Sequence, residues 1–464
     1  MRWLKKLKYY PPIHQIFQQL KDEKDAVFLD SSLKGELGKF SIIACQPYLK
    51  LVKDEIFTVN GVPCKIPFTE YLRDYLAKHQ EENPTHLPLI SGAIGYFSYD
   101  FGREKEGVAS RHAKSLSMPD CILTFYDIFI IEDHEAHNLY LIYNGKLEEF
   151  ENPKNLSNPD SLKSLVHDFV QLLQQSKKVS RQYQNTVSSK PQLNPNFTKE
   201  EYMQAVQNMR NYIQDGDIYV VNMTQQLQIK SEVTPYEMFC NLRKNNPSPF
   251  GAYLNYSDFQ IVSASIERFL QMKDGHITTR PIKGTRKRGD TAAQDAQLKE
   301  ELAHSQKDQS ELLMIVDLER NDLNRVCIPG SVQVTELFHV ETYATVFQLI
   351  ANVQGQLRPE LNAIDLLNAT FPGGSITGAP KLRAMELIDQ EEHCGRNIYT
   401  GSIGYLSLNG DCDFNIVIRS AVHQNGIYHL GVGGGITWES DPLFEYEETW
   451  QKAKALLNAL GFTL

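Results

Sequence analysis

The sequence predicts a mixed α/β protein whose sheets are largely antiparallel. Apolar segments of strand length follow one another through short hairpin turns, and amphipathic helices recur between them. Neither GxGxxG nor GxxxxGK[ST] stands at a strand-to-helix turn, which argues against the parallel sheet of a nucleotide-binding fold.

The first helix of the second half of the chain is marked at both ends. Thr198 is a typical N-cap, Glu201 completes a capping box with it, and Asp215-Gly216 supplies the stop. Between them one face is apolar, at Met203, Val206, Met209 and Ile213. A strand over Ile218–Ile229 is expected to follow.

Further along, Gln260–Met272 and His276–Arg280 predict a hairpin whose turn is Asp274-Gly275. One segment also recurs: GAIGYFS at Gly92–Ser98 returns as GSIGYLS at Gly401–Ser407. Either two strands share a composition by chance, or the chain contains a duplicated half-structure.

A length of 464 residues allows two or three domains. Residues 174–195 are rich in Gln, Ser, Asn and Lys, hold two prolines and show no sustained period, which predicts a linker. This linker separates an N-terminal region (1–173) from a second region (196–464) that carries the motifs described below.

The charge and the cysteines limit the class of protein. The net charge is −10, and the only dense basic run, Arg280–Arg288, is too short for a nucleic-acid groove but suits a small acidic substrate. The seven cysteines include no CxxC pair, which predicts a reducing compartment. No segment approaches the ~20 apolar residues of a membrane span, and the first residues lack the pattern of a signal peptide. We therefore expect a cytoplasmic protein.

Two acidic pairs with helical spacing are the candidate metal ligands. Glu445 and Glu448 lie one turn apart in a helix that Asp441-Pro442 should begin, and Lys452 continues their face. Asp308 and Glu311 form the second pair, and two such faces across a cleft would bind Mg²⁺, which prefers oxygen ligands. The alternatives are a solvated helix face, or competing ligands from the set Asp317, Glu319 and Asp322.

Two glycine-rich segments are candidate anion sites. Successive glycines at Gly431–Gly435 permit positive φ and let backbone N–H groups converge on an anion, although a plain loop after the Asn425-Gly426 turn is the alternative. Phe371–Lys381 offers a second glycine-rich turn, whose N–H groups could bind a carboxylate at the start of a helix.

Lys283 is the candidate nucleophile. It follows a strand and has four basic neighbours in sequence, Arg280, Arg286, Lys287 and Arg288. Such crowding should disfavour its charged form and leave a neutral amine. A basic surface turn is the alternative.

Taken in order, these motifs resemble those of the chorismate-utilising enzymes. The likeness covers the whole second region, in SASIERFL, RPIKGTRKRG, DLERNDLNRV, FPGGSITGAPKLRAMELI, YTGSIGY, FNIVIR and GVGGGITWESDPLFEYEET, and extends weakly into the first through FLDSSLKGELGKFSIIA and GAIGYFSYD. The family includes the large subunits of anthranilate and aminodeoxychorismate synthases, and isochorismate and salicylate synthases. It implies two interwoven α/β halves with antiparallel sheets packed face to face and helices outside.

The resemblance also implies a role for each matching residue. Glu267 matches the general acid that protonates the departing hydroxyl. The magnesium-site carboxylates are Asp308, Glu311, Glu445 and Glu448, and the substrate-binding positions are Thr285, Ser375, Tyr399, Arg419, Gly433, Gly434, Gly435 and Lys452. An arginine and backbone N–H groups suit carboxylates, and Mg²⁺ would neutralise one of them.

Three positions separate the branches of the family. Water-using members carry a lysine base where this chain has Val220, which disfavours isochorismate and salicylate synthesis. Lys283 resembles the lysine of a subset of aminodeoxychorismate synthases, where it is a covalent nucleophile, whereas many anthranilate synthases carry alanine. Gln348 replaces a family histidine linked to pyruvate elimination or to substrate orientation. The resemblance thus favours amination of chorismate for p-aminobenzoate and folate; anthranilate synthesis, or a non-catalytic regulatory role, is the alternative.

The resemblance also implies a partner. No cysteine stands in the nucleophile elbow of a glutaminase, so we expect a separate glutaminase subunit to supply ammonia from glutamine. The family's tryptophan-inhibited members carry a motif like LLES where this chain has FLDS at Phe28–Ser31, which leaves feedback control open.

Overall fold

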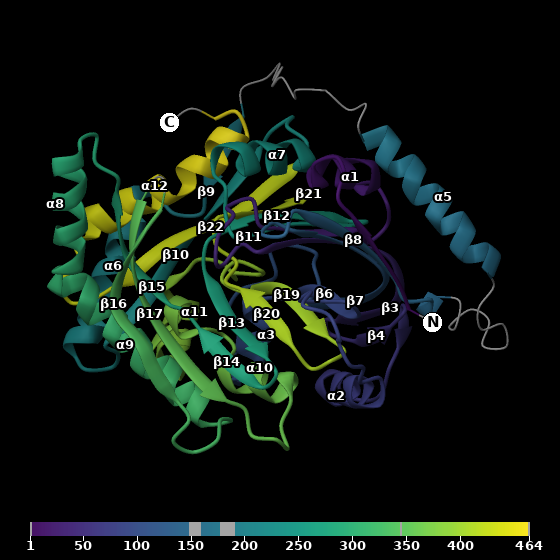
Figure 1. The fold of residues 1–464 in the computed structure, drawn as a ribbon. Coiled ribbons are helices and arrows are strands. Elements are labelled where there is room, and N and C mark those ends of the chain that lie inside the picture. The colour runs from purple at the N-terminus through teal and green to yellow at the C-terminus, as the bar shows by residue number, and fades with distance from the viewer. Residues whose placement is uncertain (1, 148–158, 177–190, 344–345, 463–464) are drawn as a thin grey trace.

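The computed structural model describes residues 2–147, 159–176, 191–343 and 346–462 of the chain. None of the helices in these ranges is long and apolar enough to cross a membrane. All strand pairs between named strands are antiparallel, as the hairpin turns predict (Figure 1).

The strands of the N-terminal region are β1 (Trp3–Leu7), β2 (Val27–Asp30), β3 (Phe40–Lys53), β4 (Phe57–Val59), β5 (Val62–Pro63), β6 (Gly92–Phe97), β7 (Cys121–Asp133) and β8 (Asn138–Tyr143). The later strands are β9 (Gln192–Pro195), β10 (Val220–Lys230), β11 (Phe250–Tyr256), β12 (Phe259–Ser265), β13 (Arg268–Lys273), β14 (His276–Thr279), β15 (Ile282–Lys287), β16 (Gln333–Thr342), β17 (Val346–Gln356), β18 (Gly378–Ala379), β19 (Ser402–Ser407), β20 (Cys412–Asn415), β21 (Ser420–Gln424) and β22 (Ile427–Ile436). The helices are α1 (Ile13–Leu20), α2 (Phe68–Lys78), α3 (Tyr99–Lys105), α5 (Pro159–Ser176), α6 (Lys199–Gln214), α7 (Pro235–Asn245), α8 (Ala292–Ala303), α9 (Gln306–Asn324), α10 (Ala363–Thr370), the short 3₁₀ helix η1 (Gly374–Ile376), α11 (Lys381–Glu391) and α12 (Pro442–Ala459).

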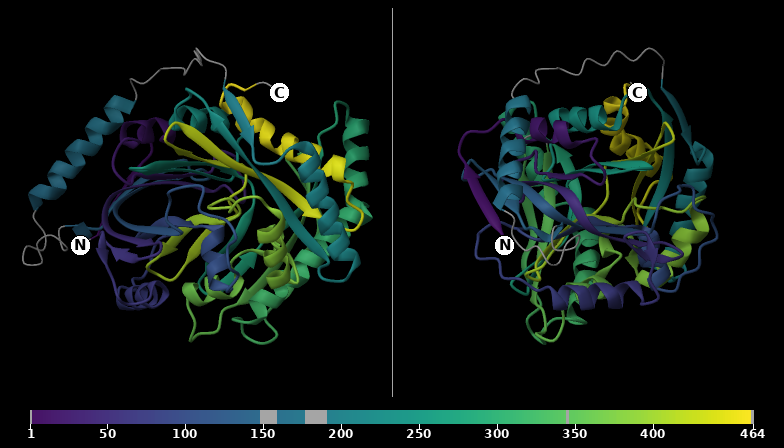
Figure 2. Two further views of the ribbon diagram at one scale, coloured as in Figure 1. Left: turned by 180° about the vertical axis from the view of Figure 1, so that it is seen from behind. Right: turned by 90° about the vertical axis from the view of Figure 1, so that its right-hand side faces the viewer.

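The strands form the interior and the helices lie outside them (Figures 1 and 2). One buried apolar cluster holds residues from strands and loops alone, among them Ile94, Leu254 and Ile403, and so lies between sheet faces. Two further clusters lie between strands and helices, the first with α6, α9 and α11 and the second with α1, α7 and α12. The expected architecture of packed antiparallel sheets with outer helices is confirmed.

The repeated heptapeptide forms the junction of the two halves. Its first copy is β6 and its second is β19, and the two strands pair directly, with Gly95 opposite Gly404. These two glycines are also the equivalent residues of the two copies, so the copies are related by a local twofold axis at this pair. A Cβ on either glycine would collide with a backbone carbonyl, of Ile122 at 1.8 Å or of Asp413 at 2.0 Å. The pairing supports the duplicated half-structure.

Most local expectations in the second half are confirmed. The capping box of Thr198 and Glu201 is present, and Asp441 caps α12. Strands β13 and β14 pair around Asp274-Gly275. The strand expected over Gln260–Met272 is wrong in one respect, because the chain breaks into β12 and β13 on either side of Glu267.

The glycine-rich segment Gly431–Gly435 is also corrected. It is neither a plain loop nor a turn with positive φ, because it continues strand β22 in extended conformation. The glycines serve close approach instead: a Cβ on Gly431 would lie 2.2 Å from the ring of Tyr399.

Strands from both sides of the expected linker join one hydrogen-bonded network. Residues 177–190 of that linker lie outside the described residues; its last residues form β9, which pairs with β10. Strand β2 pairs with β11, and β6 pairs with β19, so the two regions share their sheets.

Replacing Gly95 by alanine should destabilise the junction of the halves. The added methyl group meets a carbonyl oxygen inside a strand ladder, so we expect a loss of about 1–3 kcal/mol in the free energy of unfolding, the usual cost of overpacking. Urea denaturation measures it. The control is Gly395→Ala, whose Cβ would meet Asp100 Oδ2 at 3.6 Å, an ordinary contact. Equal stabilities for the two variants would contradict the close packing at the junction.

Candidate active site

The candidate site is built on the glycine-rich end of β22. This strand lies beside β10, with Gly433 opposite Thr224 and Gly435 opposite Asn222. On its other side β21 pairs only as far as Leu430. Among the described residues no strand pairs with the glycine-rich part of β22 on this side, so we call this edge open.

Backbone groups of two glycines point out of this edge. Lys452 Nζ donates a hydrogen bond to Gly433 O at 2.8 Å, so the polar groups of Gly433 face away from β10. Those of Gly435 face the same way, because backbone direction alternates along a strand. In agreement, Thr224 N opposite Gly433 donates to Glu392 Oε1 on the far side of β10. The N–H groups of Gly433 and Gly435 can therefore receive a carboxylate.

Charged side chains occupy the space that Gly435 leaves. A Cβ on this residue would lie 2.1 Å from Glu311 Oε1 and 3.5 Å from Lys283 Nζ. The two side chains form an ion pair of 3.0 Å, and Lys283 Nζ also donates to Ser375 O at 3.3 Å. Any side chain on residue 435 would displace them.

The second acidic pair reaches the neighbouring residue of the same strand. A Cβ on Gly434 would lie 3.3 Å from Glu445 Oε2 and 3.7 Å from Glu448 Oε1. Glu445 is buried and accepts a hydrogen bond of 2.7 Å from Ser440 Oγ, while Glu448 pairs with Lys452 at 2.6 Å. Glu311 of α9 and the Glu445/Glu448 pair of α12 thus lie beside adjacent residues of β22.

Three of the four expected magnesium ligands lie beside the adjacent residues Gly434 and Gly435. Glu311, Glu445 and Glu448 are hard oxygen donors around one edge, and Mg²⁺ needs only a few protein ligands because it keeps several waters. Over the described ranges no three acidic, histidine or cysteine residues already form a metal cluster, since these carboxylates contact lysines or a hydroxyl. The donor set fits Mg²⁺.

Asp308 is placed differently from the other three. Its carboxylate pairs with Arg286 at 3.0 Å and packs against Gly284. The competing candidates are engaged elsewhere: Asp317 pairs with Arg320, and Asp322 pairs with Lys381.

Glu319, the third competitor, is held by β14 and lies near enough to Glu267 to feel its charge. It accepts a hydrogen bond of 3.0 Å from Thr279 Oγ1. Burial raises its pKa to about 8, so near neutral pH it is largely a protonated acid rather than a ready metal ligand.

The prediction of a neutral Lys283 amine is wrong, and so is the reason for it. Its basic neighbours have acidic partners of their own: Arg280 pairs with Glu341, Arg286 with Asp308, and Arg288 with Asp295. Burial lowers the Lys283 pKa. The carboxylates of Glu311 and Glu267 raise it by more than burial lowers it, so the net shift of the pKa is upward. The sequence neighbours of a strand residue point elsewhere, so they do not set its charge.

Glu267 lies at the break between β12 and β13, beside Ser375 on η1. Its side chain is 8% exposed and is hydrogen-bonded by the Ser375 hydroxyl. Burial raises its pKa, although Lys283 and Lys452 oppose the shift. A buried carboxyl with a raised pKa holds a proton to higher pH, as a general acid requires.

Tyr399 and Arg419 are largely buried polar side chains that are suited to bind an anion. The Tyr399 ring lies flat against Gly431, and burial raises the pKa of its hydroxyl. Arg419 has φ of 50° and its carbonyl accepts from Ala264 N, close in sequence to Glu267. Burial lowers the Arg419 pKa, and none of the described side chains forms an ion pair with its guanidinium. An unpaired, largely buried arginine suits a substrate carboxylate.

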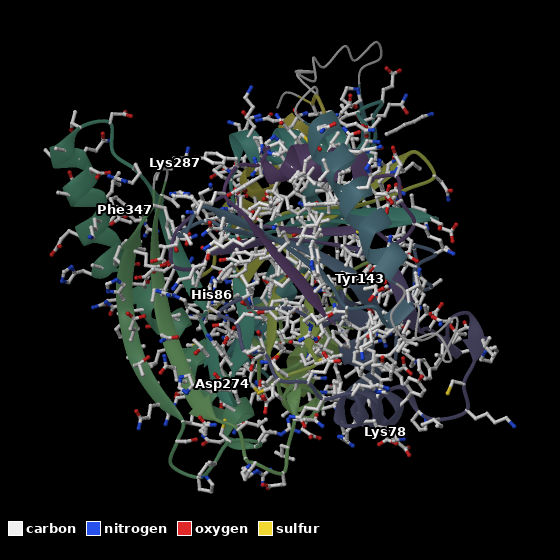
Figure 3. All side chains as sticks on the ribbon, turned by 45° about the vertical axis from the view of Figure 1, so that its right-hand side comes forward. Lys78, His86, Tyr143, Asp274, Lys287 and Phe347 are labelled. Carbon is white, nitrogen blue, oxygen red and sulfur yellow. The ribbon has the colours of Figure 1, made fainter. Side chains whose placement is uncertain are left out.

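Thr285 and Gln348 lie opposite each other in the β15–β17 ladder. Thr285 is exposed and Gln348 is buried. Lys287 and Phe347 mark the end of this ladder away from Asp274 (Figure 3).

Sequence reasoning missed the most connected charged group near the site. Arg396 and Glu392 form a buried pair, and Arg396 Nη1 reaches Thr400 Oγ1, beside Tyr399. Their spacing of four residues was the available signal, but such spacing marks many surface pairs as well.

A cavity of about 500 Å³ lies elsewhere. Leu29, Asp30 and Ser31 of the FLDS segment line it, and Asp30 pairs with Arg243 at 2.9 Å. It holds none of the predicted catalytic residues, so we place the chemistry at Lys283 and not in this cavity.

Comparison with known proteins decides the family. A model of the family described as chorismate binding enzyme matches residues 31–458, on both sides of the expected linker. The chain belongs to this family. It is 38% identical to aminodeoxychorismate synthase component 1 of Klebsiella aerogenes over 455 residues, which covers 96% of this chain and 95% of that protein.

Anthranilate synthases are similar to the chain as well. It is 35% identical to anthranilate synthase component 1 of Aquifex aeolicus over 465 residues, covering 96% of this chain and 91% of the relative. The structure of anthranilate synthase component I from Streptococcus pneumoniae superposes with a TM-score of 0.80 at 30% identity, over 91% of this chain and 93% of that one. The fold and the chorismate-binding family are therefore established.

Glu267→Gln should remove activity without loss of stability. The pKa of Glu267 is higher in the folded state than in the unfolded state. Its contribution to stability is therefore fully present below the unfolded-state pKa, and it is lost as the pH rises through the folded-state pKa. We expect chorismate turnover to fall by about 10²-fold or more, as for loss of a general acid. The Tm at pH 8 should equal or exceed that of the wild type. A clearly lower Tm, or retained turnover, would contradict the role of Glu267.

Proposed function

We propose that the chain is an aminodeoxychorismate synthase component I, which converts chorismate and ammonia to 4-amino-4-deoxychorismate. The observation that carries the proposal is the position of Lys283, whose amine lies 3.0 Å from Glu311 beside the buried acid Glu267. The similar protein of Klebsiella aerogenes bears this name.

The proposed chemistry begins with a proton transfer. Lys283 must lose its proton to solvent before it attacks, because the Glu311 carboxylate beside it is proposed as a metal ligand. The amine then adds to C2 of chorismate while the C4–oxygen bond breaks and the ring double bond shifts. Glu267 gives its proton to the departing hydroxyl, which leaves as water.

Ammonia completes the exchange in a second displacement. It adds at C4, the double bond returns, and the Lys283 amine leaves C2. The proton released by the new amine goes back to Glu267, and Lys283 regains its own proton from solvent. The balance is then chorismate and ammonia to aminodeoxychorismate and water. The enolpyruvyl group stays on the ring.

The substrate carboxylates meet the open edge of β22 in this proposal. The N–H groups of Gly433 and Gly435 receive one, and Arg419 and Tyr399 hold the other. Mg²⁺ held by Glu311, Glu445 and Glu448 would neutralise a substrate carboxylate.

Ammonia is proposed to come from glutamine through a separate glutaminase subunit, in the cytoplasm, for p-aminobenzoate and folate synthesis. The similar proteins are named component 1, which supports a multi-component enzyme.

Anthranilate synthesis is the second candidate, favoured by the similar protein of Aquifex aeolicus. It requires loss of pyruvate from the ring. At the position of the family histidine linked to that step, the structure has the buried Gln348, whose amide has no basic nitrogen. This residue argues for retention of the enolpyruvyl group.

Product analysis tests the choice between the two reactions. Purified chain with chorismate, Mg²⁺ and ammonium at high pH should give aminodeoxychorismate without pyruvate, and glutamine in place of ammonium should give no amination. Lys283→Ala should lower turnover strongly, and a covalent adduct on Lys283 should be found by mass spectrometry. Stoichiometric pyruvate with a fluorescent product would overturn the proposal in favour of anthranilate synthase.

The metal role is tested by Glu448→Gln. One lost carboxylate should raise the Mg²⁺ concentration for half-maximal turnover by about 10-fold or more, since charge is removed from a hard-cation site. Glu447→Gln on the same helix is the matched control. An unchanged Mg²⁺ dependence in Glu448→Gln, with a folded protein by circular dichroism, would exclude Glu448 as a ligand.

A further inference from the structure

In the described part of the chain, strand β10 lacks a second partner strand along the part that lies under the site. On the side away from β22, β9 pairs with Leu227–Lys230 and β18 pairs with Val220 and Val221. Between them, the outward backbone groups of β10 must find other partners, because buried backbone groups are rarely left unpaired.

A buried ion pair fills much of this gap. Glu392 Oε1 accepts from Thr224 N at 2.9 Å, and Arg396 Nη2 donates to Asn222 O at 2.6 Å. The two side chains hold each other through two hydrogen bonds, of 2.6 and 2.9 Å. Asn222 and Thr224 are the residues opposite Gly435 and Gly433, so the pair supports β10 directly behind the substrate edge.

The Arg396 guanidinium also contacts two further segments beside the site, the Ser375 turn and the Tyr399–Thr400 turn. Arg396 Nη1 donates to Ile376 O at 2.8 Å and to Thr400 Oγ1 at 3.3 Å. Ile376 follows Ser375, and Thr400 follows Tyr399. With these bonds all the N–H donors of the guanidinium are engaged. The ring of Tyr99, from the N-terminal region, covers its face at 4.7 Å.

Thr400 needs such support. It has φ of 62°, which is strained for a β-branched residue and costs on the order of 1–3 kcal/mol. The surroundings must hold it there, and the Arg396 hydrogen bond is one of the contacts that do so. The position of the Tyr399 ring depends on this turn.

We infer that Arg396 is a positioning residue of the reaction, which sets the substrate pocket by tying together β10, the Ser375 turn and the Tyr399–Thr400 turn. It acts through these residues and does not itself touch the reacting atoms. The inference rests on the proposed use of Tyr399 and the β22 glycines for chorismate.

Two variants test it. Arg396→Lys keeps the charge but loses most of the donors, and we expect the KM for chorismate to rise about 10-fold while kcat falls by less, as for weakened uniform binding. Thr400→Val keeps the shape and removes one hydroxyl, and its KM should rise about 3-fold. Chorismate consumption is followed whatever the product, and equilibrium dialysis measures chorismate binding separately. Failure of the proposed reaction is thereby distinguished from failure of this inference.

A rescue separates positioning from stability. Thr400→Gly removes the strain at positive φ, so adding it to Arg396→Lys should bring KM to within about 3-fold of that of Thr400→Gly alone. Lys50→Met, which breaks the buried pair with Asp25 in the N-terminal region, is the control for lost stability and should leave KM unchanged. An unchanged KM in both Arg396→Lys and Thr400→Val would overturn the inference. An undiminished effect of Arg396→Lys in the Thr400→Gly background would overturn the part of the inference that runs through the Tyr399–Thr400 turn.

Discussion

The pairing of β10 with β22 is the constraint on which the site depends. It fixes one strand whose end carries glycines and an open edge, and a second strand whose outer side is held by charged groups. Because Gly434 and Gly435 have no side chains, carboxylates from α9 and α12 reach the same edge from different directions. Moving either strand by one residue would reverse which faces these groups meet.

Charge compensation is the second theme of the site. Lys283 forms an ion pair with Glu311, and Lys452 forms one with Glu448. The charged side chains beside the open edge of β22 therefore neutralise one another. Burying single charges would cost several kcal/mol each, whereas paired ones can be retained. The exception is Arg419, which lacks a described acidic partner and therefore suits an acidic ligand.

The N-terminal region contributes to the site without supplying its reacting groups. Its strand β6 pairs with β19 about a local twofold axis, and β2 pairs with β11. Tyr99, the first residue of α3, stacks on Arg396, and Asp100 accepts from Asn397 N. The pocket is therefore completed by residues from both sides of the linker. The glycines of the junction allow this close pairing because they leave room for neighbouring carbonyls.

The sequence by itself determined the features that depend on near neighbours. The capping box at Thr198, the Asp274-Gly275 turn, the spacing of Glu445 and Glu448 and the order of the family motifs are all local patterns, so they could be predicted. Only the tertiary structure decided what faces Lys283, because its partner Glu311 comes from another element and its sequence neighbours pair elsewhere. The hydrogen bonds of Arg396 depend on strands that are distant in sequence, and so does the extended conformation of the β22 glycines. Periodicity within one segment of sequence does not predict such contacts.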